Sequence, residues 1–240
     1  MNNFNVCVAR ATHGNENDLG LLVHEYLDAQ IPNQYYKLVA NPRAMELDQR
    51  FVDSDLNRSF DGSGKGYEAE RVEEIRELFQ TEKFTHVVDI HTSPTTDSVI
   101  GVVPGECDSP ETNLVIATMQ QMKNIVMFKK ESNPSSLVGA FGHGGIGIEC
   151  PRYDLKAYAV IIGKGVVDLL KGVKPEQSQK LLYMIDGYVS LDVEIPGGSL
   201  RDFDEIPQIG GYGFVVCDIY KKAGFNHQGM RASTRREVSY

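Results

Sequence analysis

The feature that most constrains the fold is a regular alternation of short apolar runs with amphipathic segments through the first two thirds of the 240-residue chain. Short apolar runs predict buried strands, and apolar residues at helical spacing predict helices. The predicted strands are residues 5–9, 35–39, 86–90, 99–103, 125–128 and 146–149. The predicted helices are residues 18–30, 67–80, 111–122 and 157–171. Strands that alternate with helices predict an α/β fold, with a mixed or mostly parallel sheet flanked by helices.

The pattern changes in the last quarter of the chain. Residues 183–193 alternate between apolar and polar, and residues 213–219 form another apolar run, with no convincing helix between them. Such a pattern predicts a small β-rich C-terminal domain. We therefore expect an α/β domain over residues 1–175 and the β-rich domain over residues 176–240. The basic stretch at residues 231–236 is most simply a solvated tail.

Charge and hydropathy exclude several classes of protein. The net charge of −9 argues against a general nucleic-acid binder, although a local basic pocket can still bind an anionic substrate. No segment approaches the ~18 apolar residues that span a bilayer, and no signal peptide is visible at the N-terminus. The four cysteines lie far apart, which favours free thiols. We expect a cytoplasmic protein without nucleic-acid or membrane partners, and a homo-oligomer stays open.

Candidate ligands of a metal ion follow the predicted strands. The first strand runs into His13 and Glu16, the third into His91, and the strand at residues 146–149 ends on Glu149. In a parallel sheet, ligands bind outside the carboxyl ends of the strands. Imidazole and carboxylate are the ligands that a catalytic zinc site uses, with one position left open. A carboxyl group after so apolar a run is partly desolvated, which raises its pKa and suits general acid–base catalysis.

Each of these residues also has a simpler interpretation. His91 fits a hydrogen-bonded residue at a strand exit, and Glu149 fits an ordinary salt-bridged acid. Asp89 shares a face of an extended strand with His91, so it fits either a group that orients a metal ligand or a structural acid. For Asp89 we favour the structural acid.

A long polar segment at residues 41–66 adds positive charge near these strand ends. It carries Arg50, Asn57 and Arg58 beside apolar residues. Arginine binds a carboxylate with two hydrogen bonds and stabilises a developing oxyanion. Surface pairing of the arginines with Asp53 and Asp55 is an equally good explanation, so both stay open.

Together these motifs resemble the succinylglutamate desuccinylase/aspartoacylase family, a branch of the zinc carboxypeptidase-like fold. The resemblance lies in His13-Gly14-Asn15-Glu16, Asn41-Pro42-Arg43-Ala44, Arg50-Phe51-Val52-Asp53-Ser54-Asp55-Leu56-Asn57-Arg58-Ser59-Phe60, Asp89-Ile90-His91-Thr92 and Gly147-Ile148-Glu149, in the order of that family. The resemblance implies a catalytic domain over residues 1–175 and a small C-terminal domain near the active-site cleft.

The family also implies roles for individual residues. His13, Glu16 and His91 would bind one Zn²⁺ per chain, and Glu149 would move protons between the attacking water and the leaving amine. Arg50 would polarise the scissile carbonyl, while Asn57 and Arg58 would hold a substrate carboxylate. The implied reaction is hydrolysis of the amide of a small anionic N-acyl amino acid.

Two departures from the family concern the substrate. Aspartate-specific members have a further arginine before the catalytic glutamate, and the matching residues 139–145 contain none, although His143 offers partial anion binding or plain exposure. Those members also supply a tyrosine from the C-terminal domain, and residues 224–229 contain none. These departures weigh against acyl-aspartate. The alternatives to a deacylase are a zinc carboxypeptidase acting on small peptides and a non-catalytic protein that binds acyl amino acids.

Overall fold

The computed structural model describes residues 4–94, 96, 98–105, 109–119, 122–128, 135–173, 179–190, 204–206, 211–214 and 227–239. The strands within these ranges are β1 (Val6–Arg10), β2 (Tyr36–Val39), β3 (His86–Ser93), β4 (Ile100–Val103), β5 (Asn124–Phe128), β6 (Gly145–Pro151), β7 (Gln179–Ser190), β8 (Asp204–Ile206), β9 (Gly211–Phe214) and β10 (His227–Ser239). The α-helices are α1 (Asn17–Gln30), α2 (Pro42–Glu46), α3 (Gly66–Glu82), α4 (Pro110–Thr118), α5 (Leu137–Phe141) and α6 (Leu155–Leu170). Two 3-10 turns, η1 (Gly14–Glu16) and η2 (Leu56–Arg58), complete the set.

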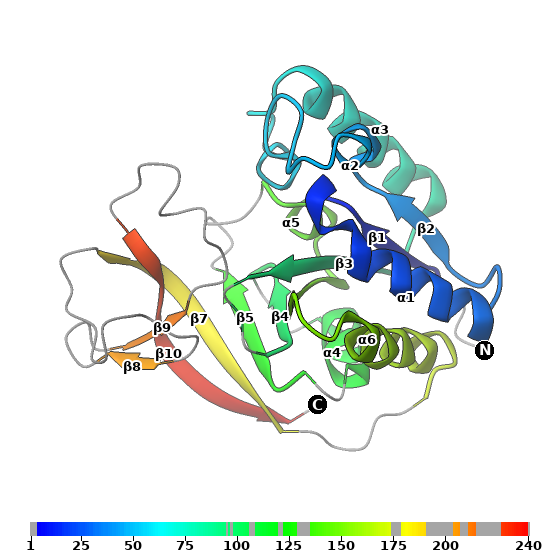
Figure 1. Cartoon of the computed structure of the whole chain (residues 1–240). Helices are drawn as coiled ribbons and strands as arrows, with labels where there is room; N and C mark the ends of the chain where they lie inside the picture. Colours follow the sequence, from blue (N-terminus) through cyan, green and yellow to red (C-terminus); the bar gives the residue numbers. More distant parts are fainter. Residues whose placement is uncertain are drawn as a thin grey trace.

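The described strands form one sheet in the order β2-β1-β3-β6-β4-β5-β7-β10-β9-β8 (Figure 1). From β2 to β7 the neighbours pair in parallel, except that β4 and β6 are antiparallel. The predicted α/β class with a mixed, mostly parallel sheet is therefore confirmed. Because β1, β3 and β6 are parallel neighbours, their carboxyl ends meet at one edge of the sheet.

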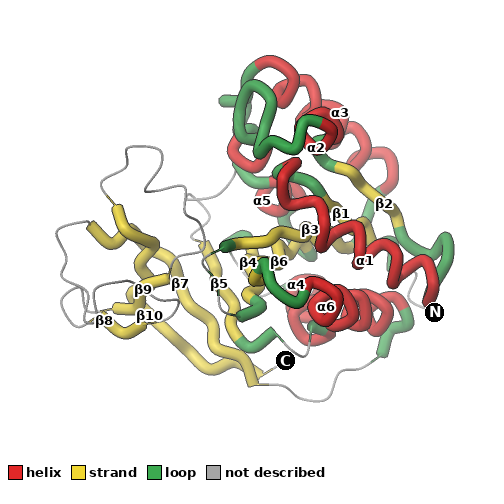
Figure 2. Tube along the Cα trace, in the orientation of Figure 1, coloured by secondary structure: helices red, strands yellow, loops and turns green. Residues whose placement is uncertain are grey.

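Helices cover both faces of the parallel part of the sheet (Figure 2). Alternate residues of β1 enter different clusters: Val6 and Val8 pack with α1, α4 and α6, whereas Cys7 and Ala9 pack with α3 and α5. This alternation follows from the two-residue period of a strand. Burial on both faces explains why the sequence of these strands is continuously apolar.

Two short helices, α2 and α5, lie outside the ranges in which the sequence predicts helices. In α2, the Asn41 side chain accepts a hydrogen bond from the Ala44 N–H at 3.2 Å, and Pro42 occupies the first turn. In α5, the Ser136 hydroxyl accepts from the Gly139 N–H at 3.0 Å. Both are N-terminal capping arrangements of the expected residue types. They were overlooked because helices this short leave no apolar period to detect.

The C-terminal strands extend the sheet through β7, which pairs in parallel with β5 and antiparallel with β10. The predicted solvated tail at residues 231–236 is wrong, because β10 pairs with β7 through this stretch. The pairing partner lies far away in the sequence, so nothing local distinguishes this basic strand from a tail. The predicted strand at residues 213–219 begins earlier, and residues 215–219 lie outside the described ranges. The division of the chain at residue 175 stays a prediction.

The described helices are all too short or too polar to cross a membrane. Cys7 and Cys150 are buried free thiols, as predicted, and Cys107 and Cys217 lie outside the described residues.

Candidate metal centre and active site

The turn after strand β1 presents His13 and Glu16 at the carboxyl edge of the sheet. Gly14, between them, packs directly on the backbone of α2, where a Cβ atom would lie 2.2 Å from the carbonyl carbon of Ala44. The Gly14 N–H also donates to the carbonyl oxygen of Arg50 at 3.2 Å. The turn is therefore held between α2 and residues 50–58, which we call the arginine-bearing segment. The space around Gly14 admits no side chain.

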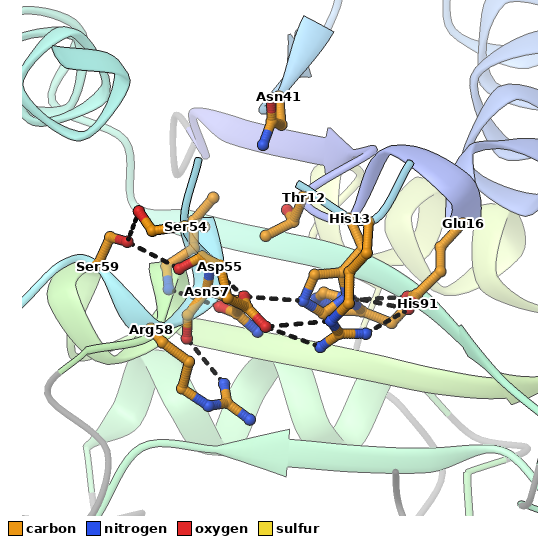
Figure 3. A network of polar contacts seen from close by, with 12 residues as sticks. Thr12, His13, Glu16, Asn41, Ser54, Asp55, Asn57, Arg58, Ser59 and His91 are labelled. Carbon is orange, nitrogen blue, oxygen red and sulfur yellow. Dashed lines mark hydrogen bonds and ion pairs between the residues drawn. The ribbon is translucent and has the colours of Figure 1, made fainter. Parts of the chain in front are cut away.

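His13, Glu16 and His91 converge, as Figure 3 shows. One ligand atom from each lies within 4.8 Å of the others, and all three residues are buried. The Nδ1 atom of His13 lies 3.0 Å from Glu16 Oε1, and the Nδ1 atom of His91 lies 3.1 Å from Glu16 Oε2. Two imidazoles and one carboxylate match the ligand set of a catalytic zinc site. This group can hold a metal ion.

The second nitrogen of each imidazole faces another carboxylate. His13 Nε2 lies 3.2 Å from Asp55 Oδ1, and His91 Nε2 lies 2.8 Å from Asp89 Oδ2. The Thr12 hydroxyl in turn donates to Asp89 Oδ1 at 2.7 Å. Carboxylates in this position fix the tautomer and orientation of metal-binding histidines. The contact of Asp89 with His91 supports the alternative in which it orients a metal ligand, and the choice between the two roles stays a prediction. Nothing in the sequence indicated that Asp55 contacts His13 or that Thr12 contacts Asp89.

The carboxylates favour positive charge between them. Burial opposes a charged His13 ring, but the charge of Glu16 and the hydrogen bond to Asp55 outweigh it and raise the pKa of His13. Burial is likewise overcome at His91, where Asp89 and Glu16 raise the pKa well above its usual value. The pKa of Glu16 is raised by burial and lowered more by the histidines, so it falls well below its usual value. A metal ion would replace the two protons that this environment attracts.

Glu149 lies beside this group on the neighbouring strand. It is the register partner of His91 in the parallel pair of β3 and β6, so the two side chains share a face of the sheet. Burial raises the pKa of the Glu149 carboxyl to about 7, with the histidines opposing the shift and Glu16 adding to it. A carboxyl group that titrates near neutrality can both accept and donate a proton at physiological pH.

Arg50 reaches the centre from the segment before η2. Its Nη1 lies 3.3 Å from Glu16 Oε1, and its Nε and Nη2 lie 3.1 and 3.0 Å from Asp55 Oδ2. The pairing with Asp55 that the sequence left open does occur, and it occurs at the site rather than away from it. The side chain is 23% exposed, so Arg50 borders both the candidate ligands and solvent.

Asn57 and Arg58 lie on η2, whose start is capped by Asp55 through the Asn57 N–H at 3.0 Å. The Asn57 side-chain oxygen accepts from the Leu137 N–H at 3.0 Å, which ties η2 to the start of α5. Arg58 is exposed and donates through Nη1 to the backbone oxygen of Asn57 at 2.8 Å (Figure 3). The structure therefore places both residues on the segment that carries Arg50 and Asp55.

Three other histidines have different surroundings. His143 is exposed, between Gly142 and Gly144. His24 binds the carbonyl oxygen of Val8 through Nε2, and His86 binds that of Glu111. Both contacts fit structural roles for His24 in α1 and His86 in β3.

The comparisons with known proteins point to one family. The chain matches the succinylglutamate desuccinylase/aspartoacylase catalytic domain over residues 4–149. A probable aspartoacylase of Prochlorococcus marinus is 31% identical over 107 residues, which cover 39% of this chain and 35% of that protein. An N-acyl-aromatic-L-amino acid amidohydrolase (carboxylate-forming) of Xenopus tropicalis is 34% identical over 105 residues, covering 37% and 33%. These matches span about a third of each curated relative.

Solved structures share the fold over nearly the whole chain. Murine aminoacylase 3 has a TM-score of 0.72 at 18% identity, covering 98% of this chain and 96% of that chain. The succinylglutamate desuccinylase of Vibrio parahaemolyticus has a TM-score of 0.71 at 14% identity, covering 98% and 82%. At these identities the likeness establishes the fold, and the chemistry must be argued from the site.

Proposed function

Because the chain belongs to the succinylglutamate desuccinylase/aspartoacylase family, we propose that it is a zinc-dependent hydrolase that cleaves the amide bond of an N-acyl amino acid. The observation that carries the proposal is the convergence of His13, Glu16 and His91. Residues 1–175 are then the catalytic domain, and residues 176–240 a β-rich domain near the cleft. A cytoplasmic location and a homo-oligomer stay predictions.

His13, Glu16 and His91 would hold one zinc ion per chain, with Asp55 and Asp89 orienting the two imidazoles. When bound, zinc supplies a Lewis acid and lowers the pKa of a coordinated water from 15.7 to about 7. The metal would be held through the Nδ1 atoms that face Glu16, since each Nε2 already faces a carboxylate.

Glu149 is the proton carrier of the reaction. Its carboxylate accepts a proton from the attacking water and then gives that proton to the nitrogen of the leaving amine. A pKa near 7 supports both halves of this cycle, because the group is neither a permanent anion nor a permanent acid at neutral pH.

Arg50 would stabilise the negative charge that develops on the carbonyl oxygen, a contribution of about 3 kcal/mol per donor. Its contacts to Glu16 and Asp55 hold the guanidinium beside the ligands. Asn57 and Arg58 would bind the carboxylate of the substrate, with Asn57 fixed by its contact to α5. Arginine is suited to this because it binds carboxylates in a bidentate geometry.

The substrate is a small anionic N-acyl amino acid. Residues 139–145 contain no arginine, so acyl-aspartate lacks a partner there for its second carboxylate. Of the aspartate-specific features, the tyrosine expected within residues 224–229 is also absent from the sequence. We therefore expect other acyl amino acids to be preferred.

The test is a metal measurement followed by a substrate screen. The purified protein should hold about one zinc per chain, and it should hydrolyse some members of a panel of N-acetyl, N-succinyl and longer N-acyl amino acids. Glu149→Gln keeps the size of the side chain and removes the ionising group, so turnover should fall by at least about 100-fold. Glu25→Gln, an exposed change on α1, is the matched control and should behave as wild type.

Each alternative has its own outcome. Faster turnover of dipeptides than of acyl amino acids would indicate a carboxypeptidase. A protein without stoichiometric metal, whose His91→Ala variant binds acyl amino acids as tightly as wild type does, would be a binding protein. Either result would contradict the proposal that the protein is a deacylase.

A further inference from the structure

Glu68 is a buried carboxylate that receives four hydrogen bonds, yet no step of the proposed reaction uses it. It lies in the first turn of α3 and is 0% exposed. Three consecutive backbone N–H groups donate to it: Val52 at 2.7 Å, Asp53 at 2.9 Å and Ser54 at 3.0 Å. The side-chain amide of Asn41 donates the fourth bond at 3.0 Å.

This environment is built for a negative charge. Successive backbone N–H groups that point at one place form an anion-binding nest. Burial alone would raise the pKa of Glu68, but the hydrogen bonds from Val52, Asn41, Asp53 and Ser54 outweigh burial and lower it. Glu68 is therefore an anion at neutral pH, and all four contacts are charge-assisted.

The contact is reciprocal, which connects α3 firmly to the arginine-bearing segment. Asp53, whose N–H binds Glu68, accepts a hydrogen bond from the Tyr67 N–H at 2.8 Å through its own carboxylate. Lys65, the residue that precedes α3, provides no side-chain cap. Asp53 thus caps the helix that supplies Glu68, in the manner of a capping box formed between two segments.

A second chain of contacts connects Glu68 to the turn that carries His13 and Glu16. Asn41, its fourth partner, caps α2 through the Ala44 N–H. The backbone of Ala44 packs against Gly14. Gly14 in turn lies between His13 and Glu16 in the sequence. One carboxylate therefore connects α3 to the arginine-bearing segment. Through Asn41 it also connects α3 to α2, the helix that packs against residues 13–16, which we call the ligand turn.

We propose that Glu68 is a positioning residue that holds residues 50–58 in the geometry needed for binding substrate, an inference that rests on the proposed function. The three amides it binds lie between Arg50, at the carbonyl, and Asn57 and Arg58, at the substrate carboxylate. Fixing the backbone at Val52, Asp53 and Ser54 sets the distance between those two contacts. Loss of that restraint lowers kcat through Arg50 and raises KM through Asn57 and Arg58.

The test compares Glu68→Gln with Glu70→Gln, an exposed change on the same helix. Glutamine keeps the shape of the side chain but turns one acceptor into an NH₂ donor, which faces backbone N–H groups. Hydrogen exchange should accelerate by at least about tenfold at residues 52–54 and not in β3. kcat/KM should fall by about 10- to 100-fold in Glu68→Gln, with zinc content unchanged and Glu70→Gln as wild type.

The outcomes separate this inference from the proposed function. Unchanged exchange at residues 52–54 overturns the role of Glu68, as does a loss of activity that only follows lost zinc or lost folded protein. If wild type hydrolyses no acyl amino acid, the deacylase fails and the exchange result alone decides whether Glu68 orders the segment. If Glu68→Gln does not fold, Glu68→Asp keeps the charge on a shorter side chain, and the same exchange result is required of it.

Discussion

Replacing Gly14 by alanine tests whether the ligand turn depends on its contact with α2. The added Cβ would lie 2.2 Å from the carbonyl carbon of Ala44 and 2.3 Å from the nitrogen of Met45. Both are backbone atoms, which cannot rotate away as a flexible side chain does. Ordinary contact begins at 3.4 Å, so the turn and α2 must separate by about 1.2 Å.

A displacement of this size exceeds what a metal site tolerates. Ligand distances in working metal sites hold within about 0.2 Å, so a shift of about 1 Å in His13 or Glu16 breaks the arrangement. We expect zinc affinity to fall by at least about 10- to 100-fold, as it does when the support of a ligand is removed. Overpacking should also cost about 1–3 kcal/mol of stability, which lowers the melting temperature by several degrees in a chain of this size.

The matched control is Gly147→Ala, also buried and also near the site. Its Cβ would meet Val102 at 3.6 Å, an ordinary contact, so the same substitution should leave zinc affinity and melting temperature nearly unchanged. Zinc affinity is measured by competition with a chelator, and stability by thermal unfolding with and without zinc. Gly14→Ala with wild-type zinc affinity would refute the reasoning, and so would an equal loss in Gly147→Ala.

Three further predictions concern Asp89, the arginines Arg50 and Arg58, and the buried Lys180. Asp89→Asn should weaken zinc binding by about 10- to 100-fold, measured by the same competition, because the carboxylate that orients His91 is lost. Arg50→Ala should mainly lower kcat and Arg58→Ala should mainly raise KM; steady-state kinetics showing the reverse would contradict the division of roles. Burial lowers the pKa of Lys180 from 10.5 to about 8, so between these values the unfolded chain binds more protons, and the free energy of unfolding should rise with pH. Denaturant unfolding across that window should show the rise in wild type and not in Lys180→Met.

The sequence alone indicated which strand ends would meet, because that step needs only local patterns and one topological rule. His13 and Glu16 follow one apolar run, and His91 and Glu149 belong to two others. Once the strands are parallel neighbours, their carboxyl ends share an edge, and the structure brings His13, Glu16 and His91 together. The prediction needed only that the strands be parallel in one sheet, and it did not require the order of the strands across the sheet.

The groups that hold these residues in place were harder to see. Asp55 and Glu68 are acids in polar segments, indistinguishable by composition from surface residues. Their meaning comes from partners distant in sequence: His13 for Asp55, and the backbone at residues 52–54 for Glu68. The strand β10 was missed for the same reason. It is recognised by its pairing with β7, which lies far away in the sequence.

The charges around His13, Glu16 and His91 favour a cation at this site, independently of any sequence motif. With neutral imidazoles, the carboxylates of Glu16, Asp55 and Asp89 outnumber the guanidinium of Arg50 that contacts two of them, which leaves an excess of negative charge around the histidines. Burying unbalanced charge is costly, so the raised pKa of each histidine is the response of the protein to that excess. A bound cation would offset this excess while leaving both imidazoles neutral, the form in which they bind metal. Hence the carboxylates that face the histidines also favour positive charge between them.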